Sequence, residues 1–496
     1  MWETFQGGLQ VIQLSHKGLM REACYIDGAW VGADDGATIT VDNPATGAVI
    51  GRVPKMGAAE TRRAIEAANA ALPAWRAKTG KERAALLRKW FELIMAHQED
   101  IARIMTTEQG KPLAEAKGEV AYAASFIEWF AEEAKRVYGD TIPTFSAGKR
   151  IVVTKEPVGV VGAITPWNFP AAMLTRKAGP ALAAGCTMVC KPASQTPFTA
   201  LALMVLAEEA GIPKGVLNLV TGSASAIGGE ITSNPIVRKL TFTGSTEIGK
   251  VLIEQCAATV KKVSMELGGN APFIVFDDAD LDAAVEGAIV SKYRNNGQTC
   301  VCANRLYVQR GVAKAFAEKL AARVARMKVG DGLEQGVVLG PLIDDAAVEK
   351  VDELLADATS KGAEVMLGGG RHELGGRFYK PTIVFGTTQE MRGAREEIFG
   401  PVAPIFVFDE EKEAVAYAND TEFGLASYFY TRDVGRVFRV MEALEYGIVG
   451  INEGLISTEV APFGGVKESG MGREGSKYGI EDYLEVKYAL IGGIGA

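Results

Sequence analysis

Histidine and cysteine are scarce in this sequence, which has three histidines and six cysteines among its 496 residues. Six scattered cysteines are too few for a disulfide scaffold, which favours a reducing compartment, the cytosol. Cys186 and Cys190 are separated by three residues, but no second pair and no histidine accompanies them, so we predict no metal site. A cysteine hydrolase would need a histidine base, and neither His97, at a polar helix end, nor His372, in a glycine-rich loop, is well placed for that role.

The sequence also lacks a basic excess and a long apolar run. Its formal net charge is −8 at pH 7 and no basic cluster reverses that sign, which argues against nucleic-acid binding. No apolar stretch approaches the length of a membrane span. Residues 1–20 have none of the basic start, apolar core and cleavage site that define a signal peptide. We therefore expect no nucleic-acid or membrane partner, and a loosely ordered N-terminal extension over residues 1–20.

Short apolar segments alternate with helical patterns over most of the chain, which is long enough for two to four domains. The strand-like segments of a first series are 158–164, 187–191, 217–220 and 237–242; those of a second are 273–276, 306–308, 404–408 and 447–451. The pattern predicts an α/β fold with two doubly wound parallel sheets, whose ligands lie at the carboxyl ends of the strands. The helix of the second series is expected at 281–293. The tail, 481–491, alternates like a strand and is expected to complete a sheet elsewhere.

The stretch 291–304, SKYRNNGQTCVCAN, is the strongest candidate for the chemistry. It places Cys300 and Cys302 among amide side chains on a glycine-containing loop after a helical run. Such a loop suits a nucleophilic thiol held near backbone N–H donors. A single cysteine is more often a small apolar core residue, so the interpretation depends on the other motifs.

Two segments that follow predicted strands favour a dinucleotide. Gly244 and Ser245 open a helix whose first N–H groups suit a phosphate, although a plain helix cap has the same pattern. Lys191 ends another strand and can reach a ribose or a phosphate. Ser194 is neutral at a place where NAD-selective sites put a carboxylate on the ribose, so it does not repel a 2′-phosphate. This favours NADP as the cofactor, with NAD as the alternative.

Two further polar residues are candidates for catalysis. Glu266 lies where a strand runs into Gly268 and Gly269, the expected hinge between the domains, and could act as a general base. A lone glutamate is more often solvated or paired. Asn168 follows an apolar strand, so its amide could serve an oxyanion hole.

Taken together, these segments resemble the aldehyde dehydrogenase superfamily, in order and spacing, over nearly the whole chain from about residue 25 to 492. The segments that carry the resemblance are TPWNFP, KPASQTP, FTGSTEIG, MELGGN, NNGQTC, EEIFGP and PFGGVKESGMGRE. Further segments resemble the succinate-semialdehyde dehydrogenases, in particular their bacterial NADP-preferring branch: CVCAN, MLTRKAGPALAAG, GLIS and GREGSKYGIEDYLEVKY.

The resemblance implies a role for each matching residue. Cys300 is the nucleophile, Asn168 and the Cys300 N–H hold the oxyanion, and Glu266 activates the water that hydrolyses the thioester. The residues expected to bind the cofactor are Trp167, Lys191, Ser194, Gly244, Ser245, Leu267, Glu397 and Phe399. The presence of Glu266 favours water over phosphate or coenzyme A as the acyl acceptor. The intact catalytic set argues against a non-catalytic relative.

Arg176, Arg294 and Ser457 match the substrate-binding positions of this subfamily. Two guanidinium groups near the thiol suit an aldehyde with a distal carboxylate, because the guanidinium fork binds a carboxylate with two hydrogen bonds. The expected substrate is succinate semialdehyde. Glutarate semialdehyde is the alternative, since one methylene is worth only about 1–3 kcal/mol in a pocket. For Arg176, an ion pair that supports the fold is the alternative. Arg294 lies six residues before Cys300, about two turns if the helix persists.

The resemblance also implies the domain organisation and the assembly. It places a cofactor-binding domain at 21–136 and 158–266, a catalytic domain at 267–467, and oligomerisation segments at 137–157 and 468–496. A protruding hairpin is expected to pair with the C-terminal strand, and a homodimer or homotetramer is expected. Some relatives with the CVC pattern are thought to join the two cysteines in a redox-sensitive disulfide, so Cys302 is a candidate redox partner of Cys300. An inert second thiol is the alternative.

Overall fold

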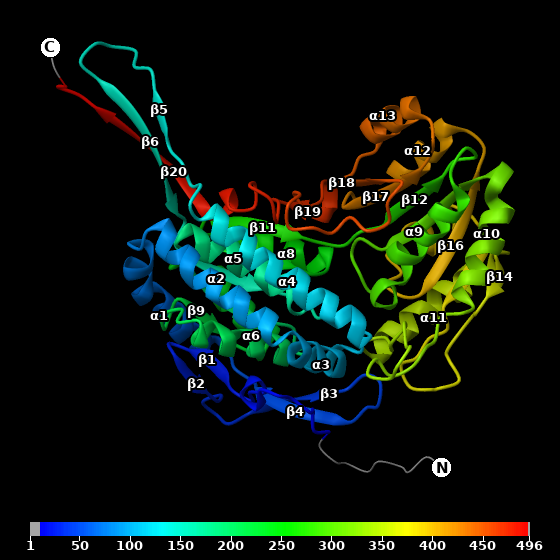
Figure 1. Ribbon diagram of the computed structural model, residues 1–496, viewed down its shortest axis with the longest axis horizontal. Helices are drawn as coiled ribbons and strands as arrows, with labels where there is room; N and C mark the ends of the chain where they lie inside the picture. The colour runs from blue at the N-terminus through cyan, green and yellow to red at the C-terminus, as the bar shows by residue number, and fades with distance from the viewer. Residues whose placement is uncertain (1–9, 495–496) are drawn as a thin grey trace.

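The structure is a computed structural model and describes residues 10–494. Two α/β units lie side by side, each built on a large sheet, and a small three-stranded sheet projects from the first unit (Figure 1). The predicted fold class is confirmed. No helix within residues 10–494 is both long and apolar enough to cross a membrane. The same residues contain no group of three or more side chains placed to hold a metal ion.

The first sheet is mainly parallel, as the alternating pattern predicts. In spatial order its strands are β19 (Gly470–Met471), β11 (Lys262–Glu266), β10 (Val237–Thr243), β7 (Val160–Ile164), β8 (Thr187–Lys191), β9 (Leu217–Leu219), β1 (Cys24–Ile26) and β2 (Ala29–Val31). The run from β11 to β9 is parallel, and β19, β1 and β2 are antiparallel edges. The parallel strands are apolar along most of their length because helices cover both faces of the sheet.

The helices of the first unit divide between the two faces of this sheet. One face is covered by α2 (Gly80–Ala96), α3 (Gln98–Gln109), α4 (Leu113–Glu133), α5 (Ala172–Ala184) and α6 (Pro197–Glu209). The other is covered by α1 (Ala58–Arg76), α7 (Ala224–Ser233) and α8 (Thr246–Ala257). This is the doubly wound arrangement, and it places the loops after β7, β10 and β11 at one edge of the sheet.

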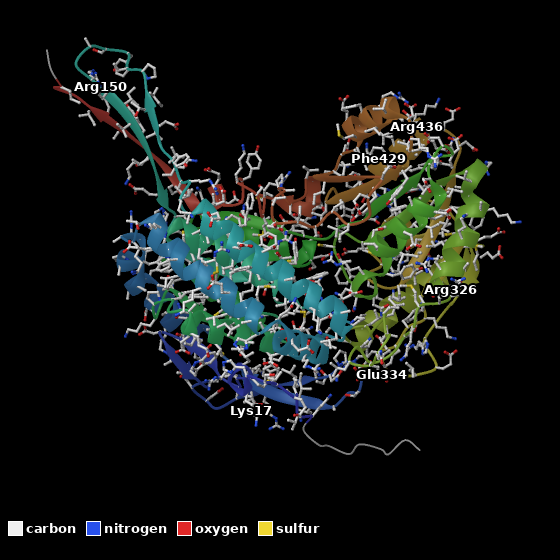
Figure 2. All side chains as sticks on the ribbon, viewed as in Figure 1. Lys17, Arg150, Arg326, Glu334, Phe429 and Arg436 are labelled. Atoms are coloured by element: carbon white, nitrogen blue, oxygen red, sulfur yellow. The ribbon has the colours of Figure 1, made fainter. Side chains whose placement is uncertain are left out.

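The second sheet has the order β14 (Glu364–Leu367), β15 (Thr382–Thr387), β16 (Val402–Phe408), β13 (Ala303–Gln309), β12 (Ala271–Val275), β17 (Ala426–Tyr430) and β18 (Ile448–Ile451). All neighbours are parallel except β14 and β15. Its helices are α9 (Leu281–Tyr293), α10 (Arg310–Val324), α11 (Asp345–Ser360), α12 (Glu411–Asn419) and α13 (Val434–Ala443). Phe429 lies in the core, whereas Arg326 and Glu334 point into solvent (Figure 2).

The C-terminal segment completes a sheet far away in the sequence, as expected. Strand β20 (Leu484–Ile491) pairs antiparallel with β6 (Arg150–Pro157), from Leu484↔Pro157 to Ile491↔Arg150, and β6 also pairs with β5 (Asp140–Ile142). The three strands form the projecting arm of Figure 1. A separate hairpin joins β3 (Thr38–Asp42) and β4 (Val49–Pro54). The short 3-10 helices are η1 (Lys17–Leu19), η2 (Arg294–Gly297), η3 (Arg392–Ala394), η4 (Lys467–Ser469) and η5 (Glu481–Tyr483).

The N-terminal extension is only partly as expected. Residues 1–9 lie outside the described residues. Residues 10–20 are not loose, because the backbone N–H groups of Ser15 and His16 both donate to the Asp100 carboxylate and the Leu19 side chain is fully buried. A pattern read along the sequence did not reveal this docking, since it depends on a carboxylate about 85 residues away.

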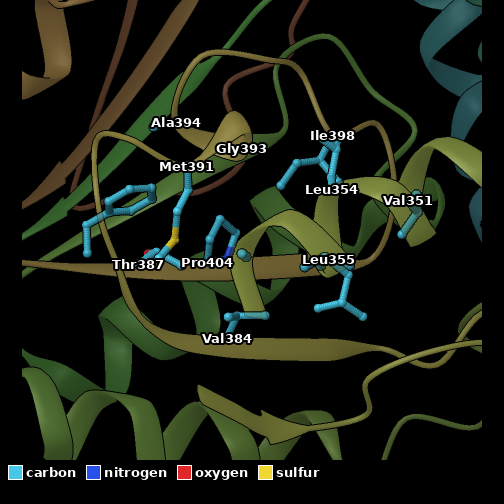
Figure 3. A pocket seen from close by; sticks show the side chains of 13 residues that line it. Val351, Leu354, Leu355, Val384, Thr387, Met391, Gly393, Ala394, Ile398 and Pro404 are labelled. Atoms are coloured by element: carbon cyan, nitrogen blue, oxygen red, sulfur yellow. The ribbon is translucent and has the colours of Figure 1, made fainter. Parts of the chain in front are cut away.

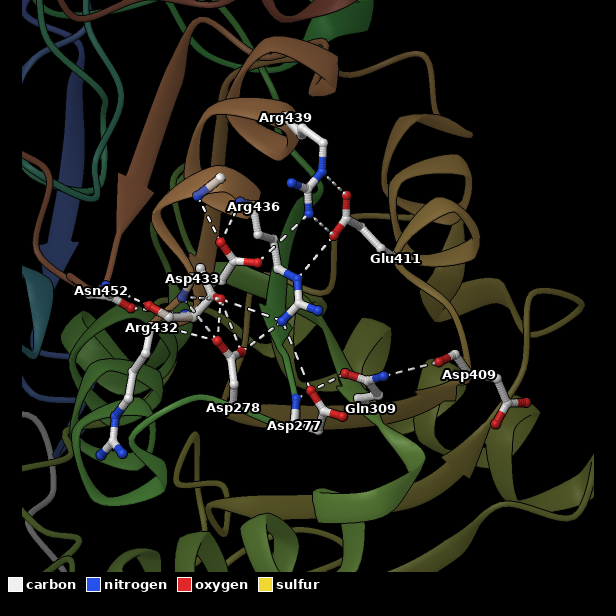
Figure 4. A network of polar contacts seen from close by, with 12 residues as sticks. Asp277, Asp278, Gln309, Asp409, Glu411, Arg432, Asp433, Arg436, Arg439 and Asn452 are labelled. Carbon is white, nitrogen blue, oxygen red and sulfur yellow. Dashed lines mark hydrogen bonds and ion pairs between the residues drawn. The ribbon is translucent and has the colours of Figure 1, made fainter.

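A carboxylate at the start of the loop after β12 ties three elements of the second unit together. Asp278 accepts hydrogen bonds from the Thr431 hydroxyl, from the N–H groups of Arg432 and Asp433, and from the Arg436 guanidinium (Figure 4). Together these bonds hold the start of α13 against the carboxyl ends of β12 and β17. The carboxylate of Asp409, which is labelled in the same figure, pairs with the exposed guanidinium of Arg310.

We expect Asp278→Ala to lower the free energy of unfolding by about 1–3 kcal/mol, because it leaves several donors without their charged acceptor. Asp409→Ala, the control, should cause no measurable change, because exposed ion pairs are screened and mobile. Urea denaturation followed by tryptophan fluorescence measures both variants. Equal effects of the two substitutions would contradict this account.

Candidate active site

One large cleft lies between the two sheets, with an open volume of about 1080 Å³. It lies at the carboxyl ends of β7, β10 and β11, where a doubly wound sheet binds its ligands. The predicted site residues that line it are Trp167, Asn168, Gly244, Ser245, Leu267, Cys300, Glu397 and Phe399. Sequence reasoning missed the side of the cleft formed by the loop before α11 and its first turns, including Asp344 and Lys350, because no motif marks them. None of the three histidines lines the cleft, which leaves a thiol hydrolase without its base.

The thiol loop begins with a sharp break in the backbone. Helix α9 ends at Tyr293, as predicted, so the helix does not persist to Cys300 and the spacing of two helical turns between Arg294 and Cys300 does not apply. Asn295 and Asn296 have φ values of 50° and 57°, and Gly297 has 77°. Three successive residues in the left-handed region cannot continue a right-handed helix. Asparagine and glycine tolerate that region best, which is the signal that could have revealed the break.

The Cys300 side chain is half-buried, whereas the other five cysteines are buried, and all six are free thiols. Burial raises the pKa of the Cys300 thiol to about 12, and the nearby carboxylate of Glu397 contributes to that increase. The thiol is therefore protonated at neutral pH in the protein alone, and forming the nucleophilic thiolate requires a base or a positive charge brought to the site.

The Asn168 amide has room for one further acceptor. Its Nδ2 donates to the main-chain carbonyl of Gln298 at 3.0 Å, and an amide nitrogen carries a second hydrogen. Its buried Oδ1 has no hydrogen-bond partner among the described residues. The loop after β7 and the thiol loop are thus joined at Gln298, and the free N–H of Asn168 suits an oxyanion formed at Cys300.

Glu266 ends β11, and its buried Oε2 has no hydrogen-bond partner within residues 10–494. Its pKa is raised well above the ordinary value, by burial first and then by the neighbouring carboxylate of Glu474. Glu474 forms ion pairs with Lys177 at 2.5 Å and with Arg176 at 2.7 Å. Because Glu474 holds both cations, Glu266 is left as the carboxyl group that retains a proton most readily.

The sequence carried a signal for this buried cluster that we did not use. In the sequence, Lys177 stands in a largely apolar stretch that predicts a buried helix. All thirteen residues of helix α5 are buried in the structure, so the Lys177 ammonium needs an acceptor inside the fold. Glu474 and Thr243 supply it, the hydroxyl at 2.6 Å. Glu474 is almost 300 residues away in the sequence, so only the folded chain identifies it as the partner.

The residues near α8 and β16 fit a dinucleotide. Ser245 caps α8, so the first N–H groups of that helix face the cleft where a pyrophosphate would bind. Glu397 accepts from the Gly269 N–H at 3.3 Å, and burial raises its pKa to about 7. Phe399 contacts Trp167 edge to face, with ring centroids 5.6 Å apart. The start of α8 suits a phosphate, the Glu397 carboxylate can accept hydrogen bonds from a ribose, and the two aromatic rings can pack against a flat ring of the cofactor.

Two predicted cofactor residues lie outside the lining of this cleft. Lys191 is buried at the end of β8, and its ammonium donates to the Pro192 carbonyl at 3.2 Å. Burial lowers the pKa of Lys191. Ser194 is half-buried in the turn that follows. Lys191 pairs in register with Ile164, just before the Trp167 turn, so both residues stand at the same edge of the sheet.

A second, apolar cavity lies behind one wall of the cleft. It has an open volume of about 370 Å³ and is lined by one face of α11, including Val351 and Leu354, together with Met391 and Ile398 (Figure 3). The cavity contains no titratable side chain, and Ile398 lines both this cavity and the cleft. We therefore assign the cavity to packing behind the cofactor wall and give it no chemistry.

The three predicted substrate residues separate into two groups. Arg294 and Ser457 line one small cavity, together with Thr299 of the thiol loop. Arg294 stacks near the Phe169 ring at 4.9 Å and has no ion pair among residues 10–494. Arg176 is buried and paired with Glu474, which also binds Lys177, and its substrate role stays a prediction.

Cys302 is buried two residues beyond the nucleophile candidate. Its Sγ lies 3.4 Å from the Lys292 carbonyl oxygen. Burial raises the pKa of the Cys302 thiol, and the Lys292 ammonium opposes that shift. The structure has no disulfide at Cys302, and the redox role stays a prediction.

A half-buried thiol, an amide donor and a cleft that suits a dinucleotide lie together between the two sheets, with a buried carboxyl group at the end of β11. The profile described as the aldehyde dehydrogenase family matches residues 30–489. The chain belongs to the aldehyde dehydrogenase family, and it is therefore an NAD(P)-dependent oxidoreductase that acts on aldehydes.

Relatives at high identity cover almost the whole chain. The chain is 70% identical over 483 residues to a glutarate-semialdehyde dehydrogenase of Pseudomonas aeruginosa. The matched region covers 97% of this chain and 100% of that relative. It is 68% identical over 481 residues to the succinate-semialdehyde dehydrogenase [NADP(+)] of Escherichia coli strain K12, with the same coverage. The crystal structure of an E. coli NADP dependent enzyme superposes with a TM-score of 0.96 at 68% identity, covering 97% of this chain and 100% of that one.

The raised pKa predicts how Cys300 reacts in the absence of cofactor. We expect its alkylation by iodoacetamide to accelerate about tenfold for each pH unit between pH 7 and 9, without a plateau, because only the thiolate reacts and its fraction rises with pH. Peptide mass spectrometry at each pH measures the rate at each cysteine. Cys302→Ala is the control and should show the same profile. A plateau near pH 8 would contradict the high pKa.

Proposed function

We propose that this aldehyde dehydrogenase oxidises an aldehyde with a distal carboxylate, succinate semialdehyde, to the dicarboxylate succinate. The observation that carries the proposal is the Arg294 guanidinium, which has no ion pair among residues 10–494 and lines a small cavity with Ser457 beside the thiol loop. An unpaired guanidinium in a confined site favours a carboxylate ligand, which it binds with two hydrogen bonds. The Ser457 hydroxyl adds a neutral donor.

The proposed reaction begins at Cys300. The thiol releases its proton to solvent, the thiolate adds to the aldehyde carbon, and the oxyanion of the resulting thiohemiacetal is held by the free N–H of Asn168 and by the Cys300 backbone N–H. A bound nicotinamide dinucleotide supplies the acceptor for the hydride that leaves the substrate carbon. Glu266 in its ionised form, which its raised pKa makes a stronger base, then takes a proton from the water that hydrolyses the thioester. Glu474, which is paired with Lys177 and Arg176, is the second carboxyl group beside Glu266.

NADP is the proposed cofactor, with NAD as the alternative. Ser245 at the start of α8 is assigned to the pyrophosphate, and Glu397 and Phe399 to the nicotinamide side. Lys191 and Ser194 are assigned to the adenine-side ribose, where a neutral serine and a cation suit a 2′-phosphate. The E. coli relative with NADP(+) in its name supports this choice.

Glutarate semialdehyde is the second candidate substrate. Two glutarate-semialdehyde dehydrogenases, from Pseudomonas aeruginosa and Pseudomonas putida, are each 70% identical to this chain. The two candidates share the carboxylate that Arg294 would bind and differ by one methylene, which a pocket discriminates weakly.

A homodimer or homotetramer in the cytosol completes the proposal. The projecting arm exposes large apolar side chains on two of its three strands, β5 and β20, and on its loop, among them Ile142, Phe145, Val486 and Tyr488. Such a patch on a thin arm is costly in water and favours burial against a second copy. The six free thiols are compatible with a reducing compartment.

A matrix of kcat/KM values tests the substrate class. We expect succinate and glutarate semialdehydes to exceed butanal by about ten- to hundredfold with NADP, the effect of one charge-assisted contact. Arg294→Met should remove that preference and leave butanal oxidation within about threefold, while Arg294→Lys should retain part of the preference. A wild type that prefers butanal, or an Arg294→Met variant that loses both activities equally, would contradict the proposal.

Replacing the proposed base tests its step. Glu266→Gln should slow thioester hydrolysis more than formation of the reduced cofactor, because the amide cannot take a proton from water. Stopped-flow absorbance at 340 nm should then show a burst of about one reduced cofactor per active site, followed by slow turnover. If the burst disappears together with turnover in a folded variant, Glu266 does not act in hydrolysis.

A further inference from the structure

A buried polar network joins helices α3 and α4 to the loop after β7. The Lys111 ammonium, which lies between these helices, forms an ion pair with Glu119 and donates to the main-chain carbonyl of Asn168 at 2.7 Å. Glu119 in turn accepts from the backbone N–H groups of Ala171 and Ala172 at 3.0 and 3.3 Å. Lys111 and Glu119 are each 2% exposed, so water does not compete for these bonds. The main chain is thereby held on both sides of the Phe169–Pro170 turn.

The same carbonyl of Asn168 is also bound from the thiol loop. The Asn295 amide donates to it at 3.0 Å and to the Gln298 carbonyl at 3.2 Å. The Gln298 carbonyl is the group that accepts from the Asn168 side chain. Asn295 itself is fixed by the Gln109 amide, which donates to its Oδ1 at 3.0 Å, and by the Glu115 carboxylate, which accepts from its N–H at 2.8 Å.

We propose that Asn295, supported by Lys111, is a positioning residue for the oxyanion hole. Two donors on one carbonyl fix the plane of the Asn168 peptide and so the direction of its side chain. The Gln298 carbonyl sets the separation between that side chain and the N–H of Cys300. The proposal rests on the catalytic roles given above to Cys300 and Asn168. Neither Asn295 nor Lys111 lines the cleft, so each acts through Asn168 and not on the substrate.

Two adjacent asparagines provide a matched test. Asn295 and Asn296 have the same left-handed backbone, but the Asn296 amide donates to the Gly340 carbonyl and not to Asn168. Glycine accepts this backbone, so each Asn→Gly change removes a side chain without straining the loop. We expect Asn295→Gly to lower kcat at least tenfold, since loss of one oxyanion donor costs about 10²–10³ and displacement costs part of that. KM and NADPH binding should change little. Asn296→Gly should lower kcat less than threefold.

The two changes are then repeated in an Asn168→Ala background. If Asn295 acts through Asn168, Asn295→Gly should alter the remaining kcat by less than threefold there, because the donor it positions is already gone. A residue that merely stabilises the loop would cost the same factor in both backgrounds. Equal losses in the two backgrounds, or equal losses for the two asparagines, would overturn the proposal.

A second variant covers the case in which Asn295→Gly fails to fold. Lys111→Met combined with Glu119→Gln removes both buried charges together and keeps an oxygen that can accept from the Ala171 N–H. It should also lower kcat in the wild type but not in the Asn168→Ala background. All variants are assayed with whichever aldehyde the wild type oxidises best. A preference for butanal would refute the proposed substrate, whereas the comparison of asparagines would still decide the positioning role.

Discussion

The left-handed backbone from Asn295 to Gly297 is the constraint on which the site depends. A non-glycine residue in this region costs about 1–2 kcal/mol, so the conformation persists only because side-chain hydrogen bonds hold it. Asn295 is bound to the first unit, and Asn296 to the loop before α11. The turn reverses the chain after α9 and brings Cys300 to the cleft. The position of the thiol therefore follows from contacts that both α/β units share.

Close passage of the backbone makes the same junction rigid. The segment between β11 and β12 runs directly past the thiol loop, and a Cβ at Gly269 would lie 2.3 Å from the Cys300 carbonyl oxygen. Only glycine fits there. The Gly269 N–H donates to Glu397. Gly269, in the segment between the two sheets, therefore contacts both the thiol loop and a wall of the cleft. A shift of one unit against the other would move all three together.

Buried charge explains why the carboxyl groups of the site behave differently. Glu474 has two cations, and its pKa is lowered by them against the effect of burial. Among residues 10–494, Glu266 has neither a hydrogen bond to Oε2 nor an ion pair with a cation, and its pKa is raised. Two carboxyl groups in one low-dielectric region do not both ionise easily. Because only Glu474 has cationic partners, Glu474 is the group that ionises and Glu266 is the group that keeps its proton. The buried cluster that supports the fold thus also raises the pKa of Glu266, the proposed base.

The sequence by itself determined the elements and the chemistry-bearing residues. Periodicity placed α9 and β8 at their observed ends, and the motifs pointed to Cys300, Asn168 and most of the predicted residues that line the cleft, because these signals are local and depend on spacing along the chain. Only the tertiary structure shows which of the two predicted substrate-binding arginines, Arg176 or Arg294, lacks an ion pair among the described residues. The sequence left an ion pair as the alternative role for Arg176, and the structure pairs Arg176 with Glu474, nearly 300 residues away, whereas Arg294 has no ion pair among residues 10–494. Pairing of buried charges depends on distance in space, which local sequence patterns do not encode.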